Sequence, residues 1–163
     1  MDHTAKLPRR AMLRWLAASA ALPALAACDK AQAKGYPVQF SDGEWKRRLT
    51  AEQYYILRKK GTEVPGTSPL LKEHRKGIFT CAADGQALFS SATKFDSGTG
   101  WPSFWAPLPG AVAYSTDWET GYPRKEVHCT RCGGHLGHVF NDGPKPTGKR
   151  YCMNGDALVF RAG

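Results

Sequence analysis

The sequence predicts one β-rich domain with many turns, preceded by a leader. Its 163 residues suffice for a single hydrophobic core, and 42% of them are hydrophobic, which is ordinary for a globular protein. Turn-forming residues are frequent, with 17 glycines and 11 prolines. The aromatic residues (5 Trp, 6 Tyr and 7 Phe) fit a domain built mainly of strands.

Residues 1–27 are predicted to be an export signal. The apolar stretch from Trp15 to Ala27 spans about 13 residues, too short and too rich in alanine for a permanent membrane span. Arg9-Arg10 ahead of it resembles a twin-arginine signal. The alternative is a general secretory signal in which two arginines happen to be adjacent.

The end of the leader resembles a bacterial lipoprotein box, Leu25-Ala26-Ala27-Cys28, in which Cys28 would be lipidated. Acyl chains there would hold the protein on a membrane surface. Ala31-Gln32-Ala33 is a competing small-x-small cleavage site. Either way we expect an exported protein, periplasmic or membrane-anchored and facing the periplasm. Residues 28–40 would form a tether, and residues 41–163 the folded domain.

The net charge is +9, and the leader, with four basic residues and one acid, leaves +6 for the rest. A basic surface is compatible with nucleic acid or with membrane phosphates. The basic residues are scattered in short groups, and an exported protein rarely meets nucleic acid. We therefore interpret them as solvated surface and expect no nucleic-acid partner.

Two short helices are predicted at the start of the domain. Ser41 and Glu44 have the spacing of a capping box, and a helix follows from Trp45 to about Leu49. Thr50 and Gln53 repeat the signal and open a second helix, which ends near Lys60-Gly61. Residues 62–69 form a loop, and strands are expected at 78–80 and 87–89.

The stretch Arg150-Tyr151-Cys152-Met153-Asn154 is predicted to lie on a strand. Side chains alternate along a strand, so Arg150, Cys152 and Asn154 share one face. A neighbouring arginine favours the reactive thiolate form of a cysteine, and an amide can hydrogen-bond beside the sulfur. The alternative is a buried structural cysteine near a surface arginine.

A metal site is predicted from cysteine spacing. Cys129 and Cys132 form a CxxC knuckle, which can supply two corners of a tetrahedral zinc site. Cys81 and Asp84 have the same spacing, with aspartate in place of the second cysteine. The candidate ligands are therefore Cys81, Asp84, Cys129 and Cys132. A disulfide or a redox CxxC remains the alternative.

A glycine-rich loop at residues 96–100 leads into Trp101, Phe104 and Trp105. So much aromatic area beside a loop suggests the apolar wall of a pocket, with Trp101 and Phe104 contacting a substrate. The alternative is that these aromatic side chains fill the hydrophobic core beneath the turn. His135 and His138 are compatible with metal binding, acid–base chemistry or a structural role.

Taken in order, these stretches resemble the peptide-methionine (R)-S-oxide reductase family over about residues 41 to 161. The matching stretches are Leu49-Thr50-Ala51-Glu52-Gln53-Tyr54, Gly61-Thr62-Glu63, Lys94 to Phe104, the Cys129/Cys132 knuckle, His135 to Pro144, and Arg150 to Asn154. The resemblance implies a mainly β fold of two antiparallel sheets with short N-terminal helices. It also implies reduction of the R-epimer of methionine sulfoxide in proteins or peptides, with no organic cofactor.

The resemblance implies a role for each matching residue. Cys152 matches the nucleophile, which would become a sulfenic acid, and Trp101 matches the residue packed on the substrate methyl group. The polar residues around the sulfoxide and the nucleophile match His135, His138, Arg150 and Asn154. The implied partner for regeneration is a thioredoxin-like thiol reductant.

The sequence departs from the family pattern at two positions. Thr99 stands where many members have a cysteine that resolves the sulfenic acid, so another cysteine or an external thiol must do so. Asp84 interrupts one of the two CxxC pairs of the zinc-binding members. The rival hypothesis is an exported zinc-knuckle binding module without catalysis, which leaves Arg150-Tyr151-Cys152 and the Trp101 loop unexplained.

Overall fold

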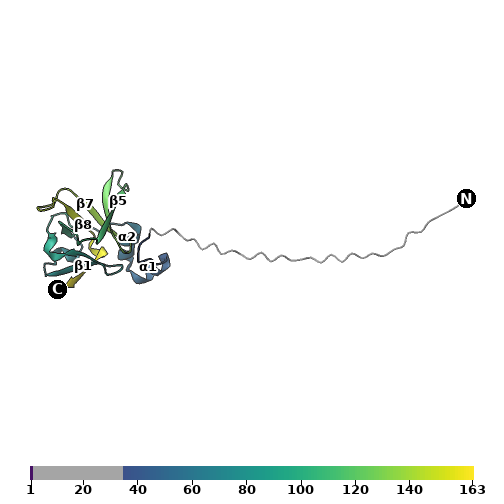
Figure 1. Ribbon diagram of the computed structural model, residues 1–163, viewed down its shortest axis with the longest axis horizontal. Helices are drawn as coiled ribbons and strands as arrows, with labels where there is room; N and C mark the ends of the chain where they lie inside the picture. The colour runs from purple at the N-terminus through teal and green to yellow at the C-terminus, as the bar shows by residue number, and fades with distance from the viewer. Residues whose placement is uncertain (2–34) are drawn as a thin grey trace. The chain divides into compact units, whose positions relative to one another are not determined.

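The computed structural model describes residue 1 and residues 35–163. The predicted signal, Cys28 and most of the tether lie outside these residues. Two antiparallel sheets and two short α-helices make up the domain, which confirms the predicted fold class (Figure 1). Within the described part of the chain, no helix is both long and apolar enough to cross a membrane.

The smaller sheet has three strands in the order β2-β1-β9, and the larger has six in the order β3-β4-β8-β7-β6-β5. The strands of the first are β1 (Gly77–Cys81), β2 (Ala87–Ser90) and β9 (Leu158–Ala162). The strands of the second are β3 (Lys94–Phe95), β4 (Ser103–Phe104), β5 (Val112–Asp117), β6 (Arg124–Cys129), β7 (His135–Phe140) and β8 (Arg150–Met153). Three 3-10 turns complete the domain: η1 (Pro69–Lys72), η2 (Ser91–Thr93) and η3 (Gly155–Ala157).

Aromatic side chains join the two sheets. Phe89 of the smaller sheet stacks on Phe104 of the larger, with ring centroids 4.4 Å apart, and Phe79 meets the same ring edge-on at 4.9 Å. All three side chains are fully buried. Aromatic pairs of this geometry add specific attraction to the burial of apolar area. The core therefore lies between the sheets, and the outer face of the larger sheet remains available for a site.

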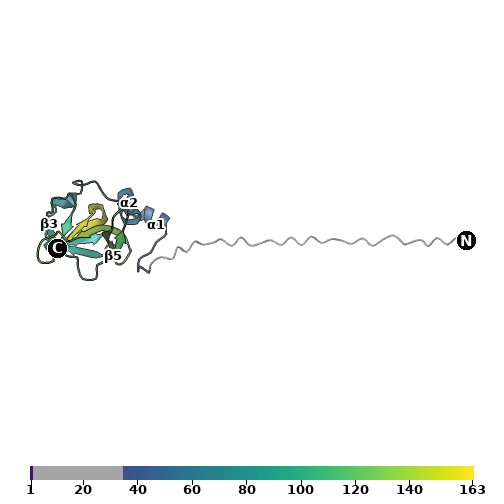
Figure 2. The same ribbon diagram turned by 90° about the horizontal axis from the view of Figure 1, so that it is seen from above.

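The two helices begin and end where the sequence signals predict. Helix α1 (Asp42–Arg48) is capped by Ser41, whose hydroxyl accepts from the Glu44 N–H. Helix α2 (Ala51–Lys59) has the full capping box of Thr50 and Gln53 and ends at Lys60 in the left-handed conformation. Figure 2 shows both helices beside the strands rather than between the sheets. They bury Trp45, Ile56 and Leu57 and so brace the β domain.

Residues 36–40, predicted as the end of a tether, lie against the domain. The Val38 N–H donates to the Arg131 carbonyl at 2.8 Å, and the Phe40 ring meets Trp45 edge-on at 4.9 Å. The Tyr36 ring lies so close to Gly133 that a Cβ there would be 2.3 Å from it. The segment therefore packs over the cysteine knuckle.

A bulge between β6 and β7 shapes the outer face of the larger sheet. Val127 pairs with Gly137, but the next residue, His128, pairs with His135, so β7 carries one extra residue. Gly137 has φ 149°, and a Cβ at this position would lie 2.2 Å from the Cys152 carbonyl oxygen. Glycine is therefore required for this close approach of β7 to β8.

Candidate active site

Cys152 lies in the middle of the larger sheet, on its outer face. Strand β8 runs between β4 and β7, where Cys152 pairs with Ser103 on one side and His138 on the other. Tyr151 and Met153 are buried in the core, and the Cys152 side chain is half-buried. This alternation is the one predicted for the strand, and it directs the thiol away from the core.

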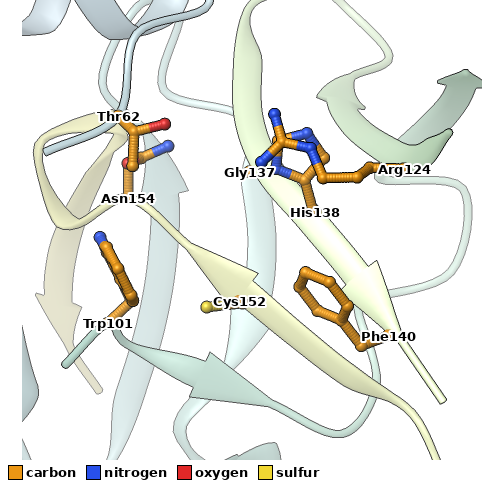
Figure 3. A pocket seen from close by; sticks show the side chains of 8 residues that line it. All are labelled: Thr62, Trp101, Arg124, Gly137, His138, Phe140, Cys152 and Asn154. Carbon is orange, nitrogen blue, oxygen red and sulfur yellow. The ribbon is translucent and has the colours of Figure 1, made fainter. Parts of the chain in front are cut away.

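The thiol faces a cavity of about 100 Å³. Figure 3 shows Cys152 between the indole of Trp101 and the ring of Phe140. Polar groups occupy the remaining wall. The lining residues are Thr62, Trp101, Arg124, Gly137, His138, Phe140, Cys152 and Asn154. A small apolar space with a few polar groups beside a thiol suits a short, mostly apolar side chain.

Glu63 holds two of the lining residues in place, a role that the matching stretch Gly61-Thr62-Glu63 did not reveal. Its backbone carbonyl accepts the indole N–H of Trp101 at 3.2 Å, and its backbone N–H donates to Asn154 Oδ1 at 3.0 Å. Its carboxylate accepts the N–H groups of Gly155 at 2.7 Å and Asp156 at 3.0 Å. Burial raises the pKa of Glu63, and these two backbone bonds oppose the shift.

His138 is held by a carboxylate and an arginine from the β5–β6 hairpin. Its Nε2 lies 2.7 Å from Asp117 Oδ2, and the guanidinium of Arg124 donates to the same oxygen at 2.6 Å. Burial lowers the pKa of His138, so the imidazole is neutral near pH 7 and donates its Nε2 proton to Asp117. Burial disfavours the Asp117 carboxylate, yet hydrogen bonds from the Glu119 N–H, His138 and Arg124 lower its pKa to about 2.

His135 lies behind His138 rather than in the cavity wall. Its side chain is 2% exposed, and its Nδ1 lies 2.9 Å from Glu126 Oε1. The bulge in β7 brings the two histidine rings, three residues apart, to a centroid distance of 5.2 Å. Burial disfavours the Glu126 carboxylate, but hydrogen bonds from His135, Lys60 and Ser115 lower its pKa.

Arg150 lies on the same face as Cys152 but is engaged elsewhere. Its guanidinium makes a bidentate salt bridge with Asp142, with 3.0 Å from Nε to Oδ1 and 2.7 Å from Nη2 to Oδ2. It also lies 4.5 Å from the centroid of the Phe140 ring. Burial raises the pKa of the Cys152 thiol, although Thr99 and the charge of Arg150 act to lower it. Arg150 thus favours the thiolate in the direction that the sequence predicts, but desolvation is the larger effect and leaves the pKa of the thiol raised.

Phe104 belongs to the core and not to the cavity. Its side chain is fully buried, pairs with Tyr151 across β4 and β8, and stacks on Phe89. The prediction that it contacts a substrate is corrected by the strand register. Ser103 pairs with Cys152, so the next residue along β4 faces the opposite side of the sheet.

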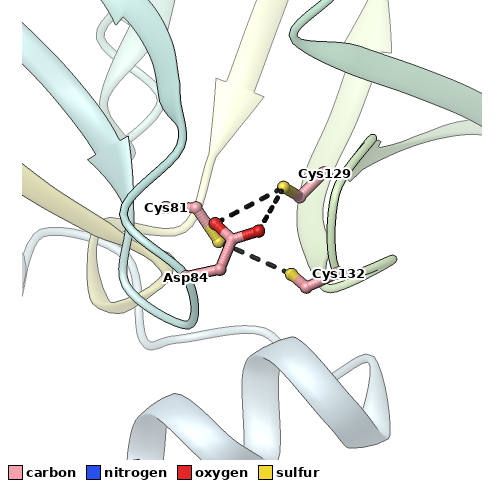
Figure 4. A group of neighbouring side chains, drawn as sticks. All are labelled: Cys81, Asp84, Cys129 and Cys132. Carbon is pink, nitrogen blue, oxygen red and sulfur yellow. Dashed lines mark hydrogen bonds between the residues drawn. The ribbon is translucent and has the colours of Figure 1, made fainter. Parts of the chain in front are cut away.

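The four predicted metal ligands come together at a separate place. Figure 4 shows the side chains of Cys81, Asp84, Cys129 and Cys132 facing one another. Their ligand atoms all lie within 4.8 Å of one another. The Cys81 and Cys132 sulfurs are 3.8 Å apart, and Cys129 Sγ lies 3.5 Å from Asp84 Oδ2. The cluster joins the β1–β2 turn to the knuckle after β6, so it could hold a metal ion that ties the two sheets together.

All four cysteines that the structure describes are free thiols, so the disulfide interpretation of the knuckle finds no support there. Within the cluster, hydrogen bonds from Cys132 and Cys81 lower the pKa of Cys129. Hydrogen bonds with Cys129 in turn raise the pKa values of Cys81 and Cys132. Without a metal these thiols share their protons in hydrogen bonds, and a dication that bound all four groups would replace those protons.

Comparison with known proteins agrees with this geometry. A family model described as the SelR domain matches residues 49–162. A peptide methionine sulfoxide reductase MsrB of Leptospira interrogans is 55% identical over 127 residues, covering 77% of this chain and 97% of that protein. The MsrB proteins of Agrobacterium fabrum and Methanosarcina barkeri are 54% and 55% identical over 124 and 125 residues. These alignments each cover 76% of this chain, and 92% and 88% of the two relatives. The chain therefore belongs to the SelR family, the peptide methionine sulfoxide reductases of the B type.

Proposed function

We infer that this chain is a peptide-methionine (R)-S-oxide reductase that returns oxidised methionine in proteins to methionine. The observation that carries this conclusion is the half-buried Cys152 thiol at a small cavity between Trp101 and Phe140. A methionine sulfoxide side chain is an apolar thioether with one polar oxygen. It matches a space with two aromatic walls and the polar side chains of His138 and Asn154.

In the reaction, Cys152 sulfur attacks the sulfoxide sulfur and the sulfur–oxygen bond breaks. The sulfoxide is reduced by two electrons to methionine, and Cys152 is oxidised to a sulfenic acid that carries the transferred oxygen. In net balance, the proton on that oxygen replaces the one that the thiol gives up. Burial raises the pKa of the Cys152 thiol, which favours its protonated form in the free enzyme.

The predicted site residues divide into two groups by their placement. We propose that Trp101 packs against the substrate methyl group and that the amide of Asn154 meets the sulfoxide oxygen, while His138, whose Nε2 proton is donated to Asp117, lines the cavity beside them. His135 and Arg150 do not line it and act as positioning residues. His135 supports the His138 ring, and Arg150 holds Phe140 while adding positive charge near the sulfur.

Regeneration then requires an external thiol. Thr99 Oγ1 lies 3.8 Å from Cys152 Sγ, and the other described cysteines belong to the cysteine cluster rather than to the cavity wall. Two thiol groups of a thioredoxin-like reductant supply the two electrons. The first forms a mixed disulfide with Cys152 and releases water, and the second displaces the Cys152 thiol.

We further propose that the cysteine cluster holds a structural Zn²⁺ with Asp84 as its fourth ligand. In a tetrahedral site with bonds of about 2.3 Å to sulfur and about 2.0 Å to oxygen, sulfurs lie about 3.8 Å apart and sulfur and oxygen about 3.5 Å apart. The distances between Cys81 and Cys132 and between Cys129 and Asp84 have these values. A zinc ion there would hold the β1–β2 turn against the knuckle.

The zinc proposal is tested by metal analysis of purified protein, which should give about one Zn per chain. Asp84→Ala should lower the zinc content, and Asp84→Cys should restore it and slow its loss to a chelator. Asp96→Ala, at an aspartate outside the cluster, is the control. Wild-type protein that is folded, active and free of metal would refute the proposal.

The leader supports a further proposal on location, since residues 1–27 have the pattern of an export signal and Cys28 that of a lipidated cysteine. The substrates would then be oxidised exported proteins, met in the periplasm or at a membrane surface. Mass analysis of the mature N-terminus in a bacterial host tests it. An acylated Cys28 is expected, and an intact leader would contradict export.

The activity is tested by turnover of each epimer of a methionine sulfoxide peptide with a small dithiol. Only the R-epimer should be consumed, and a single turnover without reductant should add one oxygen to Cys152 by mass. Equal consumption of both epimers, or an unmodified Cys152, would contradict the assignment. No turnover from folded protein would favour a non-catalytic zinc-knuckle module.

A further inference from the structure

Three hydroxyl groups link the sulfur of Cys152 to a backbone carbonyl. Thr99 Oγ1 lies 3.8 Å from Cys152 Sγ, and Ser97 Oγ lies 2.8 Å from Thr99 Oγ1. Ser103 Oγ lies 2.8 Å from Ser97 Oγ and donates to the Trp101 carbonyl at 3.1 Å. Ser103 is fully buried, so its hydroxyl must find its partners within this row.

The row can be satisfied in two directions, because each hydroxyl donates one proton and accepts others. With Cys152 as a thiol, its S–H points to Thr99, and the donors then run through Ser97 and Ser103 to the Trp101 carbonyl. With Cys152 as a thiolate, the same hydroxyls turn round, and Ser103, Ser97 and Thr99 donate in sequence towards the sulfur. In this reversal the three hydroxyls keep their protons and only rotate, and the one proton that the thiol loses goes to the sulfoxide oxygen, or to solvent when no substrate is bound.

We propose that Thr99, Ser97 and Ser103 form a reversible hydroxyl relay that stabilises the thiolate of Cys152 when the reaction needs it. Thr99, 3.8 Å from the reacting sulfur, is a catalytic residue; Ser103, which pairs with Cys152 across the strands, also hydrogen-bonds that sulfur, and Ser97 joins the two hydroxyls. A hydrogen bond to an ionised group is stronger than one between neutral groups, and a chain of donors strengthens each link. The inference deepens the proposed function, on which its catalytic meaning rests.

The relay gives a function to a residue that stands where other members of the family have a cysteine. A threonine cannot form a disulfide with Cys152, but its hydroxyl offsets part of the cost of burying the sulfur in charged form. The alternative is that these hydroxyls only fold the glycine-rich loop. The two interpretations differ in the ionisation of Cys152, which the relay controls and loop folding alone does not.

The test compares the pH dependence of Cys152 alkylation in folded variants, located by peptide mass. Thr99→Val removes the hydroxyl at nearly constant shape, Thr99→Ser keeps it, and Ser97→Ala breaks the row one step further away. Thr116→Val, on the exposed side of β5, is the control. Other charged or titratable groups around the sulfur stay unchanged in all of them: Arg150, Asp142, His138, Arg124, Asp117 and Glu63.

Thr99→Val should slow alkylation near pH 7 about tenfold by raising the thiol pKa by about one unit. Ser97→Ala should slow it about threefold, while Thr99→Ser and the control should match the wild type. Wild-type pH profiles for both Thr99→Val and Ser97→Ala would overturn the relay. If Thr99→Val does not fold, Ser97→Ala against Thr99→Ser decides the question.

Alkylation uses no sulfoxide, so it separates this inference from the proposed function. A wild-type enzyme that shows the relay's pH profile but does not reduce methionine sulfoxide would refute the function and leave the relay intact. An enzyme that turns over the R-epimer equally well with Thr99→Val, with an unchanged profile, would refute the relay alone.

Discussion

Cysteine serves two different ends in this molecule. Cys152 is a single thiol on the outer face of a sheet, half-buried and surrounded by hydroxyls and aromatic rings. Cys81, Cys129 and Cys132 are buried together with one carboxylate at the junction of the two sheets. The difference teaches that reactivity follows from surroundings. The lone thiol can be reached by a ligand in the cavity, whereas each clustered thiol is already engaged by its neighbours.

The most direct test of this difference between a reactive cysteine and structural cysteines is to replace one cysteine of each kind. Cys152→Ser should lower turnover of R-methionine sulfoxide at least about 10³-fold, because a serine hydroxyl does not attack the sulfoxide sulfur. Its thermal unfolding should stay near that of the wild type. Retained turnover would remove Cys152 from the mechanism.

Cys129→Ser should have the opposite effects, with lower stability but retained turnover. We expect loss of bound metal and a drop of at least about 3 kcal/mol in the free energy of unfolding, because the cluster ties the sheets together. Any protein that remains folded should keep measurable turnover. The two variants are compared by metal analysis, denaturant unfolding and kinetics, and a folded but inactive Cys129→Ser would show that the two regions are not separate.

Thr99→Cys would bring a second thiol into the lone-cysteine region. Because Thr99 Oγ1 lies 3.8 Å from Cys152 Sγ, a thiol there should attack the sulfenic acid and form a disulfide with loss of water. A single turnover without reductant should therefore join the introduced thiol to Cys152 in nearly every molecule, as a cross-link seen by mass. Ser97→Cys, one hydroxyl further from Cys152, is the matched control.

Glu63→Ala tests how far the cavity depends on residues outside it. It leaves the N–H groups of Gly155 and Asp156 without their carboxylate, which should cost about 1–3 kcal/mol of stability. The backbone groups of residue 63 that hold Trp101 and Asn154 remain in the variant, so KM should rise more than kcat falls only because the loosened Gly155–Asp156 turn shifts the adjoining Asn154. Glu52→Ala, on α2, is the control, and an unchanged KM would assign Glu63 a purely structural role.

The smallest expected effect is on pH dependence. The pKa of Asp117 is lowered from 3.8 to about 2 in the folded state. The unfolded chain binds protons more readily, so this stabilisation is complete above about pH 4 and is lost as the pH falls towards about 2. Unfolding measured across this range should show a loss of about 2 kcal/mol that Asp117→Asn removes. Asp142→Asn changes an exposed carboxylate paired with Arg150, and it should reduce this pH-dependent loss of stability much less.

Local patterns were enough to predict much of this molecule. The capping boxes at Ser41 and Thr50 act within a few residues, and the structure confirms them. The alternation that directs Cys152 outward also needs only the strand itself. The metal cluster followed from two matching spacings, although Asp84 breaks the usual set.

What depends on register between distant strands was missed. Arg124 reaches the cavity from another part of the chain and carries no motif of its own, and the bonds of Glu63 to two residues that line the cavity could not be read from its short matching stretch. The bulge at Gly137, which brings His135 beside His138, is set by pairing with β6. Phe104 was assigned to the pocket because a row of aromatics does not reveal which face of β4 each residue occupies.

The cavity at Cys152 is only about 100 Å³, hardly more than the end of one side chain. A methionine that is packed inside a folded protein can enter such a cavity only if the surrounding segment unfolds and exposes the side chain. We therefore expect the enzyme to act first on oxidised methionines in loops, tails or locally unfolded segments, where accessibility rather than sequence selects the substrate.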